Sequence, residues 1–257
     1  MSIEKPSPHF YTIFESNPRQ GPGQRASTER ALRRLPPLAP EQRILDIGCG
    51  AGAQTLDLAR ATPARITAVD AHPPFIAQLQ QRAAAAGLGD RIRAEVGDMH
   101  ALRFADGAFD VLWSEGAIFI IGFARGLAAW RRLLAPGGHL VLSEFCWFRP
   151  DPPAELVALH RDDAPDLGEP AARRAAIAAH GGYRLIDEFR LPESGWWEEF
   201  YAPMDANLDR FRRGHAGDPE ALAVAAQLQH EIDLYRKYRG DFGYVFFVLQ
   251  RDDGTRA

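Results

Sequence analysis

The sequence predicts one α/β domain built on a mostly parallel β-sheet. From about residue 43 onward, short apolar runs alternate with amphipathic stretches, which is the pattern of repeated βαβ units. The 257 residues, 46% hydrophobic and 25% charged, fit a single large globular domain. A glycine-rich segment at residues 48–52 lies between the first strand and the first helix, where sheets of this kind bind ligands.

The first half of the sheet follows from runs of β-branched residues and leucine. Two prolines, Pro73 and Pro74, open one helix, and Gly87 is expected to end it as a C′ glycine. Phe75, Leu79 and Ala83 recur on one face of that helix. In chain order, strands are expected at 43–47, 65–70 and 91–96, and helices at 52–60 and 73–86.

The second half begins with a strand at 109–114. The next helix is expected to place Phe123, Leu127, Trp130 and Leu134 on its core face, before a turn at 136–138 and a strand at 139–145. A stretch rich in Pro and Asp then runs to Pro170. The later elements are expected to be an alanine-rich helix at 171–179, a strand at 183–191, an aromatic insertion at 196–201, two helical segments and a closing strand at 244–249.

The organisation expected is one domain of four parts. Residues 1–40 form a helical arm or lid, 41–149 the cofactor-binding core, 150–240 a cap with substrate elements, and 241–257 the closing strand. No internal repeat and no long linker is visible.

Composition excludes several classes of protein. A net charge of -4 provides no positive field for nucleic acid or anionic lipid, and two cysteines cannot build a disulfide scaffold or a zinc cage of cysteines. The first ten residues contain Glu4 and two prolines instead of a signal-peptide core, and the longest nearly apolar stretch, 116–124, is about half a membrane span. We therefore expect a soluble cytoplasmic protein, with a homodimer left open.

No metal is expected. The histidines lack ligand spacing, and Asp162, Asp163 and Asp166 fit a solvated loop better than a metal site.

The glycine segment predicts a surface on which a ligand lies. Glycine at Gly48 and Gly50 permits positive φ and removes the Cβ, while the following helix directs its amide groups to the same place. The spacing is G-x-G-x-G, whereas dinucleotide sites use G-x-G-x-x-G. Asp46 at the mouth of this loop would repel a pyrophosphate and attract an ammonium group.

Two further acids extend the pattern. Asp70 ends the second strand, where a carboxylate accepts hydrogen bonds from ribose hydroxyls. Asp98 follows the third strand and could accept from an adenine amine. A ligand that presents ammonium, ribose and adenine in this order is S-adenosylmethionine.

Four landmarks in order carry a resemblance to a known family: the loop at 44–52, the acid in Val69-Asp70, the turn Gly97-Asp98-Met99, and the strand 109–113 before residues 131–138. Over residues 43–145 the sequence resembles the class I S-adenosylmethionine-dependent methyltransferases. The resemblance implies a Rossmann-like seven-stranded sheet with an antiparallel last strand, helices on both faces and helical cap insertions. Three outer segments, at 19–23, 113–118 and 196–203, resemble a narrower group of bacterial small-molecule methyltransferases.

The resemblance also implies an activity: methyl transfer to a small molecule by in-line displacement, with S-adenosylhomocysteine as product. The Asn/Asp-Pro-Pro-Tyr/Phe signature of many nucleic-acid and protein methylases is missing, because Ser114-Glu115-Gly116 stands in its place. Two alternatives remain open at this point: a nicotinamide-dependent oxidoreductase on a similar sheet, and a non-catalytic binding protein of the same fold.

The predicted site residues fall into three groups. A general base is optional, because alignment can carry much of a methyl transfer; the candidates are Glu115, then Glu144 and His9. The predicted cofactor-binding residues are Arg19, Gln20, Asp46, Gly48, Cys49, Gly50, Asp70, Ala71, Asp98, Met99 and Ser114. The predicted substrate-pocket residues are Tyr11, Phe14, Trp113, Trp147, Trp196, Trp197, Tyr201 and Tyr244.

Overall fold

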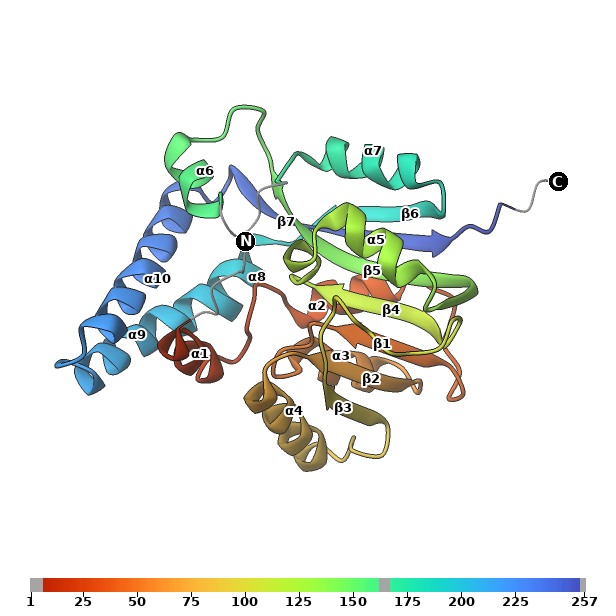
Figure 1. The fold of residues 1–257 in the computed structure, drawn as a ribbon, viewed down its shortest axis with the longest axis horizontal. Helices are drawn as coiled ribbons and strands as arrows, with labels where there is room; N and C mark the ends of the chain where they lie inside the picture. Colours follow the sequence, from red (N-terminus) through yellow and green to blue (C-terminus); the bar gives the residue numbers. More distant parts are fainter. Residues whose placement is uncertain (1–6, 162–166, 255–257) are drawn as a thin grey trace.

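A seven-stranded sheet forms the centre of the molecule in the computed structural model, which describes residues 7–161 and 167–254 (Figure 1). The strand order is β3-β2-β1-β4-β5-β7-β6, and β7 alone runs antiparallel to its neighbours. The predicted α/β class and the antiparallel last strand are confirmed. The strands are β1 (Arg43–Ile47), β2 (Arg65–Asp70), β3 (Ile92–Val96), β4 (Phe109–Glu115), β5 (Leu134–Trp147), β6 (Tyr183–Arg190) and β7 (Phe242–Arg251).

Helices cover both faces of the sheet. Alternate residues of each strand point to opposite faces, so one apolar strand contributes to two cores. On one face the core includes α2 (Arg25–Leu32), α3 (Ala53–Ala61) and α4 (Pro73–Ala85). On the other face, α5 (Phe123–Arg131) and α7 (Pro170–His180) pack over the sheet (Figure 1).

The remaining helices gather beyond the carboxyl ends of the strands. The helix α1 (Pro8–Glu15) packs against α9 (Ala202–Gly214) and α10 (Pro219–Tyr238), and these three lie together at one side of the molecule (Figure 1). Two short helices, α8 (Glu193–Trp196) and the π-helical turn η2 (Trp197–Tyr201), lead into α9. The remaining short helices are η1 (Ile118–Ile120) and α6 (Ala154–His160).

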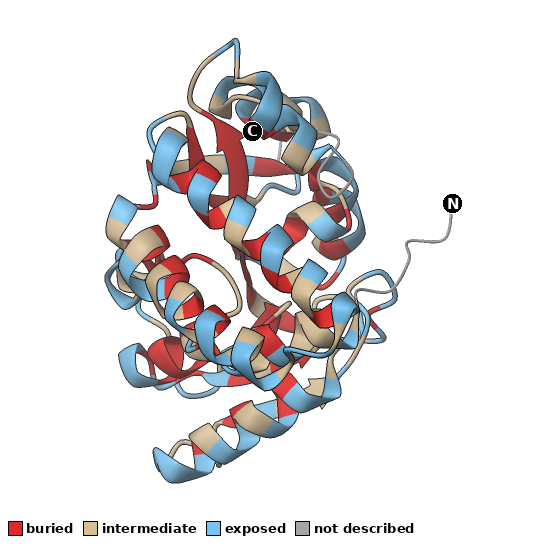
Figure 2. Cartoon of the chain, turned by 90° about the vertical axis from the view of Figure 1, so that its left-hand side faces the viewer, coloured by how far each residue is buried: buried red, intermediate tan, exposed pale blue. Residues whose placement is uncertain are grey.

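The long helices of this group are amphipathic. In α10, one stripe of residues is buried: Ala221, Ala225, Leu228, Ile232 and Tyr235. Asp218 caps α10 by accepting hydrogen bonds from the backbone N–H groups of Glu220 and Ala221. Figure 2 shows the result, with buried and exposed residues alternating along each helix and the strands buried between the layers.

One predicted boundary is wrong. Leu134 was expected on the core face of a helix and residues 136–138 in a turn, but α5 ends at Arg131 and β5 already begins at Leu134. Leu134 pairs with Phe109 of β4, and the register shifts before Val111 pairs with His139. The irregular pairing accommodates the proline and glycines inside the strand, where their local signal indicated a turn.

The predicted cap segment 150–240 contributes to two regions. Its first half supplies α7 and β6 to the sheet layers, and its second half forms α8 to α10. Within the described ranges, no helix is long and apolar enough to cross a membrane. The aspartates at positions 162, 163 and 166 lie outside the described residues.

Candidate active site

The glycine loop connects β1 to α3 and needs glycine for two reasons. Gly48, Gly50 and Gly52 have φ of 74°, 54° and 82°, a region that side chains other than glycine rarely adopt. A Cβ on Gly48 would lie 2.5 Å from Ala117 Cβ, and one on Gly52 would lie 2.2 Å from a Leu79 methyl carbon. The loop is therefore packed tightly underneath and presents backbone to its open side.

Asp70, at the end of β2, binds the loop directly. Its Oδ2 accepts a hydrogen bond from Gly50 N–H at 2.8 Å, and its Oδ1 accepts one from His72 N–H at 2.9 Å. Each carboxylate oxygen has a second lone pair, so both can still accept a ribose hydroxyl. Burial raises the pKa of Asp70, while these two backbone donors lower it.

Asp46 lies beneath the loop and is completely buried. It accepts hydrogen bonds from Thr55 Oγ1 at 2.6 Å and Gln54 Nε2 at 3.4 Å, both from the first turn of α3. Burial raises the pKa of Asp46 to about 7, with the nearby Glu115 contributing in the same direction. In this position Asp46 links β1 to α3. The glycine loop lies between the carboxyl group and any ammonium group on the other side of the loop, so the two would not be in direct contact.

The other predicted cofactor residues surround the loop. Asp98 is exposed and its Oδ1 accepts from the His100 backbone and ring, which lowers the pKa of the carboxyl group. The Met99 side chain reaches toward Gly48, while its carbonyl accepts from Trp130 Nε1 at 3.2 Å. Ala71 is exposed beside Asp70.

Two predicted cofactor residues turn their side chains away. Ser114 is buried and donates from Oγ to the Ile47 carbonyl at 3.0 Å, and Cys49 is buried under the loop. Only their backbone atoms are available to a ligand on the open side.

The amino-terminal segment closes over the loop. Gln20 Oε1 accepts from Ala51 N–H at 2.7 Å and lies 2.9 Å from where a Gly50 Cβ would be. Arg19 is buried and forms ion pairs with Asp57 Oδ2 at 3.3 Å and Glu115 Oε2 at 3.9 Å. The predicted partner of Arg19 was a cofactor carboxylate; in this structure it faces two carboxylates of the chain itself.

Glu115 is the last residue of β4 and lies beside Arg19 of the amino-terminal segment. Its Oε1 accepts hydrogen bonds from Thr28 Oγ1 at 2.7 Å and Trp113 Nε1 at 2.9 Å. Burial raises the pKa of Glu115, and Arg19 lowers it. The carboxyl group therefore links the amino-terminal segment to the sheet, while Oε2 accepts no hydrogen bond within the described chain.

The two weaker base candidates lie elsewhere. Glu144 is buried and forms an ion pair with Arg173 of α7 at 3.1 Å, on the α5–α7 side of the sheet. His9 faces α10, where its Nε2 lies 3.1 Å from Asp218 Oδ2.

Tyr11 lies near Asp70, at the turn between β2 and α4. Its ring stacks on His72, with centroids 4.1 Å apart and planes at 10°, and His72 Nε2 lies 2.7 Å from Glu15 Oε1. Burial and then the Asp70 carboxylate raise the pKa of Tyr11. Tyr11 was predicted in the substrate pocket, but α1 places it beside the residues that follow β2.

Most other predicted aromatic residues form one group at the carboxyl end of β5. We define the aromatic cluster as Phe145, Trp147, Trp196, Tyr235, Phe242 and Tyr244. Trp196 is central, with centroid distances of 4.8 Å to Tyr244 and 5.5 Å to Tyr235. Tyr201 and Trp197 extend the cluster, while Phe14 packs on Phe10 and Phe200. Trp113 is fully buried beneath Glu115.

Sequence reasoning missed three residues of this region. Thr28 contacts Glu115 from 87 positions away, and His72 meets Tyr11 and Glu15 across 61 and 57 positions. His160 packs 4.6 Å from Phe145, and burial lowers the pKa of His160 to about 4. No local motif marks such contacts; only the proximity of His72 to Asp70 along the chain was a signal.

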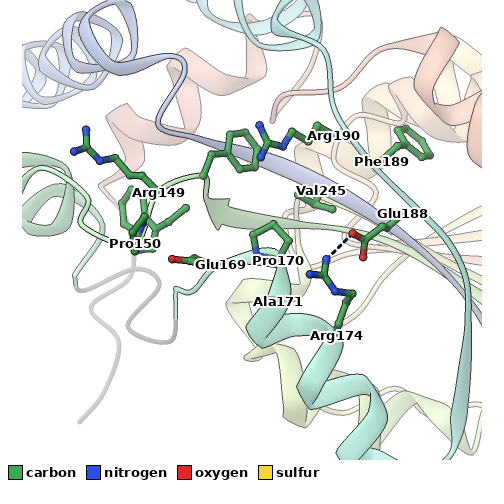
Figure 3. Close-up of a pocket in the computed structure, with 12 residues that line it drawn as sticks. Arg149, Pro150, Glu169, Pro170, Ala171, Arg174, Glu188, Phe189, Arg190 and Val245 are labelled. Carbon is green, nitrogen blue, oxygen red and sulfur yellow. Dashed lines mark hydrogen bonds and ion pairs between the residues drawn. The ribbon is translucent and has the colours of Figure 1, made fainter.

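A cavity of about 440 Å³ opens at a different place, near the amino end of α7 (Figure 3). Arg149, Arg174 and Arg190 line it together with Glu169 and Glu188, and Arg174 is paired with Glu188 at 2.6 Å. None of the predicted cofactor residues lines this cavity. Within the described residues, no three His, Cys, Asp or Glu side chains are arranged to hold a metal ion.

Comparisons with known proteins agree with this geometry. Residues 44–138 match the family described as "Methyltransferase domain". Demethylmenaquinone methyltransferase from Thermus thermophilus is 36% identical over 53% of this chain and 58% of its own. Escherichia coli YjhP, described as uncharacterised, is 28% identical over 94% of this chain and 98% of its own.

Solved structures give the same result over nearly the whole chain. The structure of E. coli YjhP matches with a TM-score of 0.82 and 25% identity, covering 95% of this chain and 99% of that one. An S-adenosylmethionine-dependent methyltransferase from Geobacter sulfurreducens, in complex with S-adenosylhomocysteine, matches with a TM-score of 0.79 and 25% identity over 95% and 98%.

The first curated methyltransferases that match are only partly covered: the chain spans between 34% and 58% of their lengths. The matched domain, the sheet order and the loop with its acids nevertheless agree. Residues 44–138 therefore carry a methyltransferase domain, and the chain as a whole shares the fold of the class I S-adenosylmethionine-dependent methyltransferases.

Proposed function

We propose that the protein binds S-adenosylmethionine and transfers its methyl group to a small-molecule acceptor, releasing S-adenosylhomocysteine. The observation that carries the proposal is the contact between Asp70 and Gly50 N–H. This contact places a carboxylate with free lone pairs beside the glycine loop, as a ribose next to a methionine moiety requires.

The arrangement favours methyl transfer over the nicotinamide alternative. The loop lacks the third glycine of the dinucleotide pattern. The amino-terminal segment and the aromatic cluster cover the carboxyl ends of β4 and β5, which suits a dry site where alignment does most of the catalysis.

Glu115 is the proposed general base for an acceptor that must lose a proton, with Glu144 and His9 as weaker proposals. Its Oε2 has no hydrogen-bond donor, and the ion pair with Arg19 at 3.9 Å is long. Glu115 also holds Thr28 and Trp113, so the base role competes with a structural one.

We further propose that the enzyme acts in the cytoplasm on free metabolites and that it binds neither nucleic acid nor membranes. Both a monomer and a homodimer are consistent with the sequence. Size-exclusion chromatography with light scattering measures the oligomeric state directly.

Calorimetry and turnover test the proposal. S-adenosylmethionine and S-adenosylhomocysteine should bind, whereas NADH should not, and a metabolite panel should release S-adenosylhomocysteine with at least one acceptor. Binding of NADH alone would support the oxidoreductase, and cofactor binding without any turnover would support the non-catalytic alternative. In Glu115→Gln, the limb of the pH profile that falls with acid should disappear if Glu115 is the base.

A further inference from the structure

The cavity beside α7 is separate from the proposed reaction centre. Its volume of about 440 Å³ lies in the range of small-molecule sites. Val245, which lines it, belongs to the core on the α5–α7 face of the sheet, whereas Glu115 contacts Thr28 of α2, which covers the other face. Four strand spacings, about 19 Å, separate β6 at this cavity from β1 at the glycine loop. Because a methyl acceptor must approach its donor to about 3.5 Å, this cavity offers room for a different ligand.

Five charged side chains line the cavity, and three of them already have partners. Arg149 forms ion pairs with Asp151 at 3.2 Å and with Asp241 at 3.1 Å. Arg174 pairs with Glu188 at 2.6 Å (Figure 3). These arginines are therefore compensated by carboxylates of the chain itself, and the cavity does not present a group of free cations to a phosphate.

The other two charges, Arg190 and Glu169, are of opposite sign and have no ion-pair partner within the described residues. They do not pair with each other either (Figure 3). The Arg190 guanidinium lies 3.8 Å from the centroid of the Phe148 ring, which covers its face and leaves its N–H groups for hydrogen bonds. The Glu169 side chain precedes α7 without capping the helix. The cavity thus presents one available cation and one available anion.

The uncharged side chains of the lining are apolar, and they include Trp147, Phe148 and Val245. We propose that this cavity binds an amino acid with an apolar side chain. Its carboxylate pairs with Arg190, its ammonium group pairs with Glu169, and its side chain contacts the apolar wall. The inference does not depend on the proposed methyl transfer.

Three probes that share a phenyl ring test the proposal. L-Phenylalanine carries both charges, 3-phenylpropionate lacks the ammonium group, and 2-phenylethylamine lacks the carboxylate. NMR titrations on protein saturated with S-adenosylhomocysteine keep the probes out of the cofactor site. The wild type should bind L-phenylalanine about 3- to 10-fold tighter than either of the other two.

Two charge-removing variants assign the ends of the ligand. Arg190→Gln should weaken L-phenylalanine and 3-phenylpropionate by about 3- to 10-fold and should not weaken 2-phenylethylamine. Glu169→Gln should weaken L-phenylalanine and 2-phenylethylamine by a similar factor and should not weaken 3-phenylpropionate. Both side chains are at least partly exposed, so the fold should be retained.

Two further variants locate the binding and control for charge. Ala171→Trp, at an exposed position of the first turn of α7, fills the cavity without changing its charge and should weaken all three probes. Arg184→Gln is the matched control, because Arg184 is an exposed arginine near the other end of β6 and does not line the cavity. It should change none of the affinities.

The results decide the inference in either direction. A loss of affinity that follows the charge of each probe supports an amino-acid site. The inference is overturned if L-phenylalanine does not bind, if it binds no tighter than 3-phenylpropionate, or if Arg190→Gln, Glu169→Gln and Ala171→Trp leave its affinity unchanged. Absence of S-adenosylhomocysteine binding would contradict the proposed function alone, and the same titrations on the free protein would still decide this inference.

Discussion

We propose that Asp70 combines a structural role with a cofactor-binding role in one carboxylate. Asp70→Ala should weaken S-adenosylhomocysteine binding by about 10- to 100-fold, because the ribose hydroxyls lose a charged acceptor. It should also lower the free energy of unfolding by about 1 to 3 kcal/mol, because the N–H groups of Gly50 and His72 lose their acceptor. Calorimetry and urea denaturation measure the two effects.

Asp98→Ala is the comparison for Asp70. The Asp98 side chain is 61% exposed, and its hydrogen bonds within the described residues go to His100, so this change should leave stability nearly unaltered. A loss of stability in Asp70→Ala with normal cofactor affinity would show that Asp70 only supports the loop.

Asp46 should make folding depend on pH. Its pKa is about 7 in the folded protein, above the ordinary value of 3.8, so the folded state holds the proton more tightly than the unfolded state. The stabilisation is therefore complete below about pH 4 and is lost as the pH rises through 7. Asp46→Asn removes this dependence. The free energy of unfolding of the variant, relative to that of the wild type, should therefore be about 2 to 3 kcal/mol higher at pH 8 than at pH 5.

Urea denaturation of both proteins at pH 5 and pH 8 measures this difference. If the free energies of unfolding of the two proteins differ by the same amount at pH 5 and at pH 8, Asp46 is ionised in the folded state at both pH values.

The sequence was most informative where one residue type is required by local geometry. Gly48 and Gly50 need positive φ, and Asp70 must follow a strand, so spacing alone located them. The surroundings of Glu115 could not be predicted in this way, because Arg19 and Thr28 arrive from a segment about 90 positions earlier. Periodicity describes which face of an element is buried and carries no information on the partner that covers it.

Among the elements, α1 has the clearest functional consequence. It contacts α9 and α10 on one side and the β2–α4 turn on the other, through Tyr11, Glu15 and His72. An element of eight residues has little helical stability alone, so these contacts hold it in place. If residues 1–40 form a lid, as the sequence predicts, the stack of Tyr11 on His72 is one contact that attaches the lid to the β2–α4 turn.

Tyr11→Ala should weaken S-adenosylhomocysteine binding by about 5- to 10-fold, mainly through faster release, because the stack beside Asp70 is lost. The change does not lower the intrinsic helix propensity of α1, since alanine has a higher propensity than tyrosine, so its effect comes from the loss of the tertiary contacts of Tyr11. Stopped-flow displacement gives the release rate. Thr12→Ala, an exposed change on the same helix, should have no effect, and an equal effect of both variants would contradict a role for the stack.

β5 shows where local signals mislead. Pro136, Gly137 and Gly138 are a strong turn signal, yet they belong to a strand that pairs with β4. The pairing across a register shift supplies the hydrogen bonds that the local sequence does not favour. Such tertiary effects determine boundaries, whereas the order of the strands was correct from pattern alone; the short helices η1 and α6 were not predicted.

In the molecule as a whole, the cap and the sheet share one core. Met204 and Leu208 of α9 are fully buried in the same apolar cluster as Ile44 of β1 and Val141 of β5. A cap that folded independently would have a core of its own. We therefore expect a single cooperative unfolding transition.

Leu208→Ala tests this expectation. The cavity should lower the free energy of unfolding by about 2 to 5 kcal/mol. Hydrogen exchange should show the same loss of protection for the slowest amides of β1 as for α9. Loss confined to α9 and α10 would show that the cap opens separately from the sheet.

The position of β7 determines the order in which the sheet can be completed during synthesis. Within the described chain β6 pairs with β7 alone, and about 50 residues separate the end of β6 from the start of β7. At 5 to 20 residues per second, a ribosome needs roughly 3 to 10 s to make that stretch. Throughout this interval the β5 edge and the Phe189 side of β6 have no strand to join, so the nascent chain exposes the apolar surface that molecular chaperones bind.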